Sequence, residues 1–257
     1  MYVTLIAVAA LWGAAAGMLV PRAAYRLSVE PEETWRDACP AGHPFTGRAR
    51  GWIGGARCTE CAVVPGTAHP VTTATVPYRP SLAVPLATSL ACAALAAATG
   101  ARPELAVWLL LAPFAVLLAV VDLNVHRLPD HLTLPLAAAS AALLGLAALL
   151  PAHAGSWTTA LLGGLALGAG YLLLFLIHPA GMGFGDVKLA LSLGIALGWH
   201  GWAVLLVGAF AGFLLGSLYG VALIALRRAG RKSAIPFGPF MILGALVGLL
   251  LGGLARL

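Results

Sequence analysis

Charged residues are scarce in this sequence of 257 residues: Asp, Glu, Lys and Arg make up 9% of it, whereas apolar residues make up 61%. The mean hydropathy of +0.95 is far above the values of soluble proteins. This composition excludes a soluble globular protein and indicates a polytopic membrane protein. The net charge of +6 does not indicate a nucleic-acid partner, because the basic residues lie in the polar segments between apolar runs.

Three kinds of site are absent from the sequence. The four cysteines do not suit a disulfide framework, because Cys92 lies in an apolar run and the other three fall in one polar segment. No glycine-rich nucleotide fingerprint of the soluble kind is present. No serine, cysteine or histidine arrangement suits a nucleophilic triad. His126 and His131 have no spacing that assigns them a role, so we interpret them as loop histidines.

The apolar residues fall into eight runs that suit membrane helices, since a bilayer core of about 30 Å needs about 20 helical residues. The expected spans are 2–21, 82–100, 105–122, 132–150, 157–178, 187–200, 202–226 and 237–255. We therefore predict an all-α, polytopic membrane helix bundle, in which 187–200 is too short to face lipid. The first run lacks a preceding basic region and a clear cleavage site, so we expect a retained helix rather than a signal peptide.

Basic residues gather on one side of this arrangement. The segments 22–81, 123–131, 179–186 and 227–236, with Lys188, hold all Lys and Arg except Arg102 and Arg256. The positive-inside rule makes that side cytoplasmic and places the N-terminus outside. We expect a first transmembrane helix over 1–21, a small cytoplasmic loop domain over 22–81 and a membrane-embedded domain over 82–257.

Three carboxylates follow Glu104: Asp122, Asp130 and Asp186. An ionisable group at the edge of a bilayer is costly unless it is paired, hydrated or used. Asp122 and Asp186 both border apolar segments on the predicted cytoplasmic side. Two aspartates in one site share a proton, so that one accepts a proton from water while the other polarises an amide carbonyl. This pair predicts peptide-bond hydrolysis.

The polar residues beside this pair have alternative roles. Asp130 follows Pro129, and we interpret it as a helix cap whose carboxylate accepts backbone N–H bonds. Arg127 either anchors the chain at the cytoplasmic face or fixes a substrate or a nearby carboxylate. Lys188 either snorkels to the interface, or tunes the aspartate pair or binds an acidic group of the substrate.

Two glycines, Gly183 and Gly185, precede Asp186. Glycines permit φ > 0 and leave no side chain between the backbone and an approaching peptide, so an extended substrate is able to pair there. The alternative is a tight turn that ends in an N-cap aspartate.

Three segments together resemble the signature blocks of type IV prepilin peptidases, which are bacterial membrane aspartic proteases with a Gly-x-Gly-Asp motif. The first is Asp122 with Arg-Leu-Pro-Asp-His-Leu-Thr-Leu-Pro at 127–135. The second is Gly-Met-Gly-Phe-Gly-Asp-Val-Lys-Leu at 181–189, and the third is Ile-Pro-Phe-Gly-Pro-Phe at 235–240. The blocks have the family's order and spacing, and the resemblance covers about residues 82–257.

The resemblance implies that Asp122 and Asp186 are the catalytic pair, with no cofactor for proteolysis. It implies substrate-binding or supporting roles for Gly183, Gly185, Lys188, Arg127, Pro236 and Gly238. The expected activity is removal of the short leader of prepilin or pseudopilin-like precursors, before their hydrophobic helix, at the cytoplasmic face of the bacterial inner membrane. The expected partners are these precursors and the lipid bilayer.

The polar segment contains a reduced form of a zinc-binding loop that the resembled family carries as two Cys-x-x-Cys pairs. Here Cys58 and Cys61 form one pair, and Cys39 with His43 replaces the other. Three thiolates and one imidazole suit tetrahedral zinc, and a cytosolic loop keeps its thiols reduced. His69 is a rival fourth ligand, and a metal-free loop is the alternative.

Bifunctional members of the resembled family also methylate the new N-terminus with S-adenosylmethionine. Their first block is a Gly-x-x-x-Gly helix followed by Asn and Arg-x-Pro. The segment Gly13–Leu27 is similar to it, but the Asn position is lost. This departure leaves the methyltransferase activity open, and S-adenosylmethionine is expected only if that activity is retained.

Two other classes of function compete. A proton-coupled transporter would use Asp122 and Asp186 as a proton relay, but we see no internal repeat of the kind that transporters show. A catalytically silent scaffold of a secretion or pilus system would have no reason to keep carboxylates that are costly in a membrane.

Overall fold

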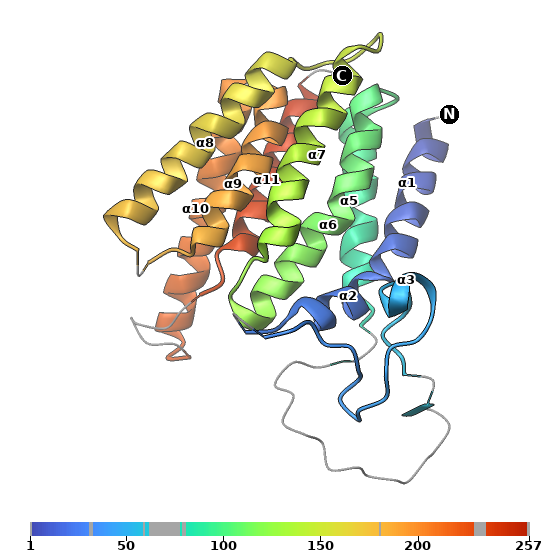
Figure 1. Ribbon diagram of the computed structural model, residues 1–257. Coiled ribbons are helices and arrows are strands. Elements are labelled where there is room, and N and C mark those ends of the chain that lie inside the picture. The colour runs from blue at the N-terminus through green and yellow to red at the C-terminus, as the bar shows by residue number, and fades with distance from the viewer. Residues whose placement is uncertain are drawn as a thin grey trace.

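The computed structural model describes residues 2–30, 33–58, 60–61, 78, 81–179, 181–228 and 235–255, and within these ranges the chain forms a bundle of helices (Figure 1). The membrane helices in chain order are α1 (Tyr2–Gly17), α5 (Ala83–Thr99), α6 (Pro103–Val125), α7 (Asp130–Ala148), α8 (Trp157–Ile177), α9 (Phe184–Trp199), α10 (Trp202–Ala225) and α11 (Gly238–Leu254). The shorter helices are α2 (Val20–Leu27) and α3 (Arg48–Gly51). The prediction of a polytopic all-α bundle is confirmed.

Within the described residues, five apolar segments are long enough to cross a bilayer by themselves: Tyr2–Leu27 (α1 and α2 together), Pro103–Val125, Asp130–Ala148, Trp157–Ile177 and Trp202–Ala225. α5 and α11 have 17 residues each and α9 has 16, which corresponds to about 24–26 Å at 1.5 Å per residue. Most residues of α9 are buried. This short helix lies inside the bundle, where its length does not have to match the lipid.

Glycines allow the helix pairs to approach closely. A Cβ at Gly13 would lie 2.6 Å from the backbone oxygen of Thr88 in α5, and a Cβ at Gly244 in α11 would lie 2.3 Å from the backbone nitrogen of Gly212 in α10. Membrane helices associate through such close van der Waals packing, because lipid tails remove the hydrophobic drive between helices.

The first helix is shorter than the expected span 2–21. α1 ends at Gly17, and a separate helix, α2, begins at Val20 with Pro21 in its first turn. Proline has no N–H to bond the carbonyl four residues earlier, so it suits the start of a new helix better than the interior of the old one. Val20 and Leu27 of α2 pack with Val121 of α6, so the start of the expected loop domain is part of the bundle.

The ends of the helices sort onto two sides (Figure 1). The two chain termini lie at one end of the bundle. The polar segment that follows α2 lies at the other end, together with the last turn of α6 and the first turns of α7, α9 and α11. The predicted catalytic residues therefore come from different helices to the same end of the bundle.

Candidate active site

Asp122 lies in the last turn of α6 and is only 4% exposed. Its Oδ2 accepts a hydrogen bond of 2.9 Å from the backbone N–H of Gly238, the first residue of α11. A Cβ at position 238 would lie 2.8 Å from the same oxygen. Position 238 is therefore a glycine because the carboxylate occupies the space of a side chain.

Asp186 lies in the first turn of α9 and is 6% exposed. Its Oδ2 accepts a hydrogen bond of 3.2 Å from the backbone N–H of Gly183, the N-cap residue. The alternative of an N-cap aspartate is wrong, because Asp186 is the third helical residue and reaches back to the cap. Gly183 has φ −74°, and Gly185 is not among the glycines with positive φ. Neither glycine therefore uses the positive φ that glycine permits.

Both carboxylates line one cavity of about 1120 Å³ at this end of the bundle. The cavity is lined mainly by the loop after α6, the segment between α8 and α9, the start of α9 and the segment before α11. Two carboxyl groups in one cavity are able to divide the roles of proton acceptor and proton donor.

Leu128 lies against both Gly185, which precedes Asp186, and Gly238, whose N–H binds Asp122. A Cβ at Gly185 would lie 2.8 Å from Leu128 Cβ, and a Cβ at Gly238 would lie 3.5 Å from Leu128 Cδ1. The side chain is buried and lines the cavity. Gly185 is thus a packing requirement, whereas Gly183 meets only Asp186 Oδ2 at 3.5 Å and the nitrogen of Gly185 at 3.9 Å. Leu128 belongs to the first of the three signature blocks, but sequence reasoning assigned it no role, because a leucine in an apolar chain shows no sign of its contacts.

Asp130 does not cap α7. The N-cap residue is Pro129, and no side-chain cap bond is present there. Instead, Asp130 Oδ1 lies 2.5 Å from Lys188 Nζ, and this ion pair joins the start of α7 to the first turn of α9. Lys188 Nζ also lies 4.7 Å from the centre of the Phe184 ring. Pairing with an opposite charge is one of the ways in which ionisable groups are stabilised at a membrane edge.

The other predicted supporting residues also line the cavity. Arg127 and Pro236 both do so, as do His126 and His178. His131 lies outside this set, and its ring contacts that of Trp35 at 5.7 Å between centroids. The structure thus brings Arg127, Pro236 and Lys188 to one cavity with the two aspartates.

A Cys/His cluster lies in the polar segment after α2. The ligand atoms of Cys39, His43, Cys58 and Cys61 all lie within 4.8 Å of one another. His43 Nδ1 is 3.2 Å from Cys61 Sγ and 3.6 Å from Cys39 Sγ and from Cys58 Sγ. Tetrahedral zinc with bonds of about 2.0–2.3 Å holds its ligands about 3.3–3.8 Å apart. The cluster fits a metal ion, and the rival ligand His69 lies outside the described residues.

Neighbouring groups change the pKa of the Cys58 thiol. Burial alone would raise its pKa, but hydrogen bonds from Cys61, Cys39 and the backbone of Glu60 outweigh burial and lower the pKa to about 7, whereas burial and the neighbouring thiols of Cys58 and Cys39 raise the pKa of Cys61. Thiolate is the form of cysteine that binds metals.

Fold and site together define a polytopic membrane protein with two buried aspartates in one cavity at one end of its bundle. The chain belongs to the type IV leader peptidase family, whose sequence model matches residues 109–253. A prepilin leader peptidase/N-methyltransferase of Aeromonas salmonicida is 35% identical over 154 residues, which cover 56% of this chain and 48% of the relative. A protein of the same name from Pseudomonas aeruginosa is 31% identical over 206 residues, which cover 77% of this chain and 63% of the relative.

The chain thus spans about half the length of the Aeromonas relative, with 48% of it aligned. No solved structure matches the chain. None of these comparisons supports the alternative of a proton-coupled transporter.

Proposed function

We propose that this chain is a membrane aspartic endopeptidase that removes the leader peptide of prepilin or pseudopilin-like precursors. The observation that carries the proposal is that two aspartates, Asp122 and Asp186, are buried and line one cavity. The names of the relatives, which are prepilin leader peptidases, supply the substrate class. Residues 82–257 with the packed helix α2 form the peptidase domain.

The reaction proceeds by general acid–base catalysis in this cavity. The ionised carboxylate of the pair removes a proton from a water molecule, whose oxygen attacks the scissile carbonyl carbon. The protonated carboxyl donates to the carbonyl oxygen and stabilises the tetrahedral intermediate. The C–N bond then breaks, and the leaving amine takes up the proton that the first carboxylate removed from water.

Neighbouring backbone and side chains support these steps. The N–H groups of Gly238 and Gly183 each donate to one carboxylate and hold its orientation. A substrate in extended conformation approaches beside Gly183, where no side chain stands in the way. Arg127 and Pro236 line the same cavity and contact the leader.

The active site faces the cytoplasm in this proposal, and the N-terminus of α1 lies outside. The support is the positive-inside rule, since the segments that join the helices at the active-site end carry most of the basic residues. A cytoplasmic position also keeps Cys39, Cys58 and Cys61 reduced, so that with His43 they bind a structural zinc ion.

Mass spectrometry of a co-expressed prepilin tests the proposal. The expected result is a product that begins at the junction between the leader and the hydrophobic helix, with no such product in cells that lack the chain. Uncut precursor in the presence of the inserted chain would contradict the proposal. The same spectrum shows whether the new N-terminus carries the mass of a methyl group, which reports on the second activity in the relatives' names.

A further inference from the structure

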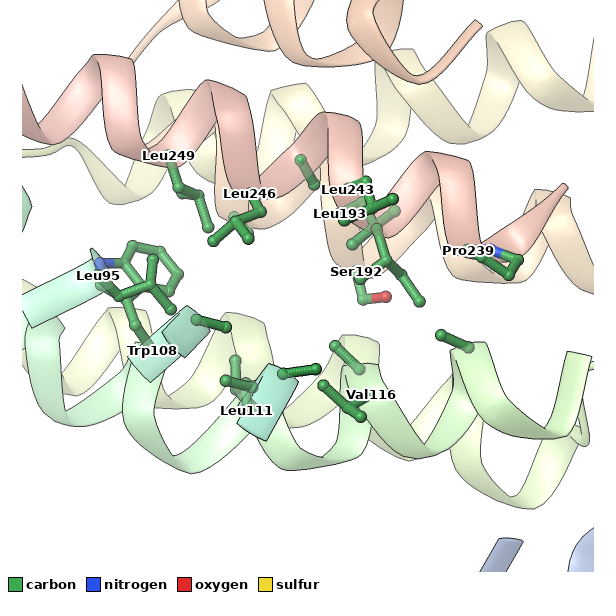
Figure 2. A pocket seen from close by; sticks show the side chains of 18 of the residues that line it. Leu95, Trp108, Leu111, Val116, Ser192, Leu193, Pro239, Leu243, Leu246 and Leu249 are labelled. Atoms are coloured by element: carbon green, nitrogen blue, oxygen red, sulfur yellow. The ribbon is translucent and has the colours of Figure 1, made fainter. Parts of the chain in front are cut away.

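An apolar groove lies beside the active-site cavity, inside the membrane part of the bundle. It has a volume of about 410 Å³ and is lined by α5, α6, α7, α9 and α11 (Figure 2). Two of its lining residues, Ser140 and Ser192, carry a hydroxyl group, and none of the lining residues is charged. Its size lies in the range of ligand pockets.

The wall that α6 contributes leads directly to the catalytic carboxylate. Ala112, Ala115 and Ala119 line the groove, and their spacing of three and four residues places them on one face of the helix. The next position in this series is Asp122. The alanine face therefore ends at the carboxylate.

The wall that α11 contributes leads to the same point. Ile242, Ala245 and Leu249 line the groove at the same helical spacing, and the preceding position in the series is Gly238. The groove lining reaches Leu123 and Pro239, the sequence neighbours of Asp122 and Gly238, and Gly238 donates its N–H to Asp122, so both walls end beside one hydrogen bond. The groove and the active-site cavity share no lining residue, so this bond stands at the boundary between an apolar space and a polar one.

The groove has the length of a helix and is open along one side. On α6 its lining runs from Leu123 to Trp108, which corresponds to about 22 Å at 1.5 Å per residue. Leu243 on α11 is 47% exposed, whereas Leu95 and Trp108 at the far end are buried. Alanines along the wall allow a further helix to approach with its backbone close to α6.

We propose that this groove binds the hydrophobic helix that follows the scissile bond of the substrate. The inference rests on the proposed function and adds to it the surface that holds the part of the precursor beyond the cut. With the helix in the groove and the leader in the polar cavity, the bond between them lies at Asp122. Position along the groove thus selects which peptide bond is cut.

Filling the groove tests this inference. Ala115→Leu and Ala91→Leu place larger side chains in the walls that α6 and α5 contribute, at positions that do not border Asp122. Two substrates are compared: a full prepilin in detergent or liposomes, and a short soluble peptide that contains the leader and the first few mature residues. Overpacking of this kind is expected to lower kcat/KM for the full prepilin roughly tenfold and to leave cleavage of the short peptide unchanged.

Ala166→Leu is the matched control, because Ala166 is an exposed residue of α8 outside the groove. Full-rate prepilin cleavage by both groove variants would overturn the inference, and it would mean that lipid alone fills the groove. Failure of the wild-type chain to cut either substrate would instead count against the proposed function.

Cross-linking gives a second readout that does not depend on activity. Ala119→Cys is paired with single cysteines along the hydrophobic helix of the prepilin, and Ala166→Cys is the control. The native cysteines stay in place, and because Cys61 is exposed, cross-links formed by the chain without an added cysteine are subtracted as background. Cross-links are expected from Ala119→Cys at helix positions three or four residues apart, and none from the control. Equal cross-linking of both, or none from Ala119→Cys, would overturn the inference.

Discussion

The backbone N–H of Gly238 donates to Asp122 Oδ2 at 2.9 Å, across 116 positions of the chain. This bond ties the end of α6 to the start of α11 and fixes one oxygen of the carboxylate. The Asp122 carboxylate occupies the space that a side chain at position 238 would need.

Gly238→Ala is expected to displace Asp122, because the new Cβ would lie 2.8 Å from Oδ2. A shift of about 1 Å in a catalytic group lowers kcat/KM roughly 100-fold, whereas membrane insertion is expected to stay normal. Purified variants are compared for cleavage of a prepilin. Gly170→Ala is the control, since a Cβ there would meet no atom within 4 Å. Equal loss in both variants would show that the effect is not local.

The ion pair between Asp130 and Lys188 yields a prediction about positioning. Asp130→Asn and Lys188→Met are each expected to lower kcat a few-fold, because the start of α9 and thus Asp186 are held less firmly. The effect on stability is small, roughly 0.5 kcal/mol, because the Asp130 side chain is 58% exposed. The charge-swapped double variant Asp130→Lys/Lys188→Asp should recover most of the lost kcat.

Steady-state kinetics distinguishes this role from substrate binding. If Lys188→Met raises KM while Asp130→Asn leaves KM unchanged, the lysine acts on an acidic group of the substrate. Such a split, with no recovery in the double variant, would contradict the positioning role.

The Cys/His cluster predicts one zinc ion per purified chain, measured by elemental analysis. Cys58→Ser is expected to lose the metal, because three ligands remain of the four that tetrahedral zinc needs. Cys92→Ser should keep it, since Cys92 is buried in the bundle. Zinc content that is the same in both variants, or absent from the wild-type chain, would contradict the assignment.

Much of this fold was predictable, because a bilayer forces each span to satisfy its own backbone and to be apolar over its whole length. The expected span 157–178 corresponds to the helix Trp157–Ile177, and the expected span 202–226 corresponds to the helix Trp202–Ala225. The break between α1 and α2 was not predicted, because Val20 and its neighbours are as apolar as the helix before them. A hydropathy profile does not distinguish a helix that ends before Pro21 from one that continues through it.

The site was predictable where the chemistry was local and unpredictable where it depended on contacts between distant segments. Asp122 and Asp186 were conspicuous as carboxylates in an apolar chain. The partner of Asp130 was not, because a cap and an ion pair both suit an aspartate at a helix start, and Lys188 is 58 positions away. The contact of Leu128 with Gly185 and Gly238 exists only after α6, α9 and α11 have packed together.

The central claim is that Asp122 and Asp186 act as one catalytic pair. Its most direct test is cleavage of a prepilin by the purified variants Asp122→Asn and Asp186→Asn, which keep the shape of each side chain and remove its acid–base function. Each variant is expected to lose about 10³-fold or more in kcat, and the double variant should be no slower than the slower single variant, because the two groups act as a unit. Cleavage at the wild-type rate by either single variant, with the protein folded and inserted, would contradict the account.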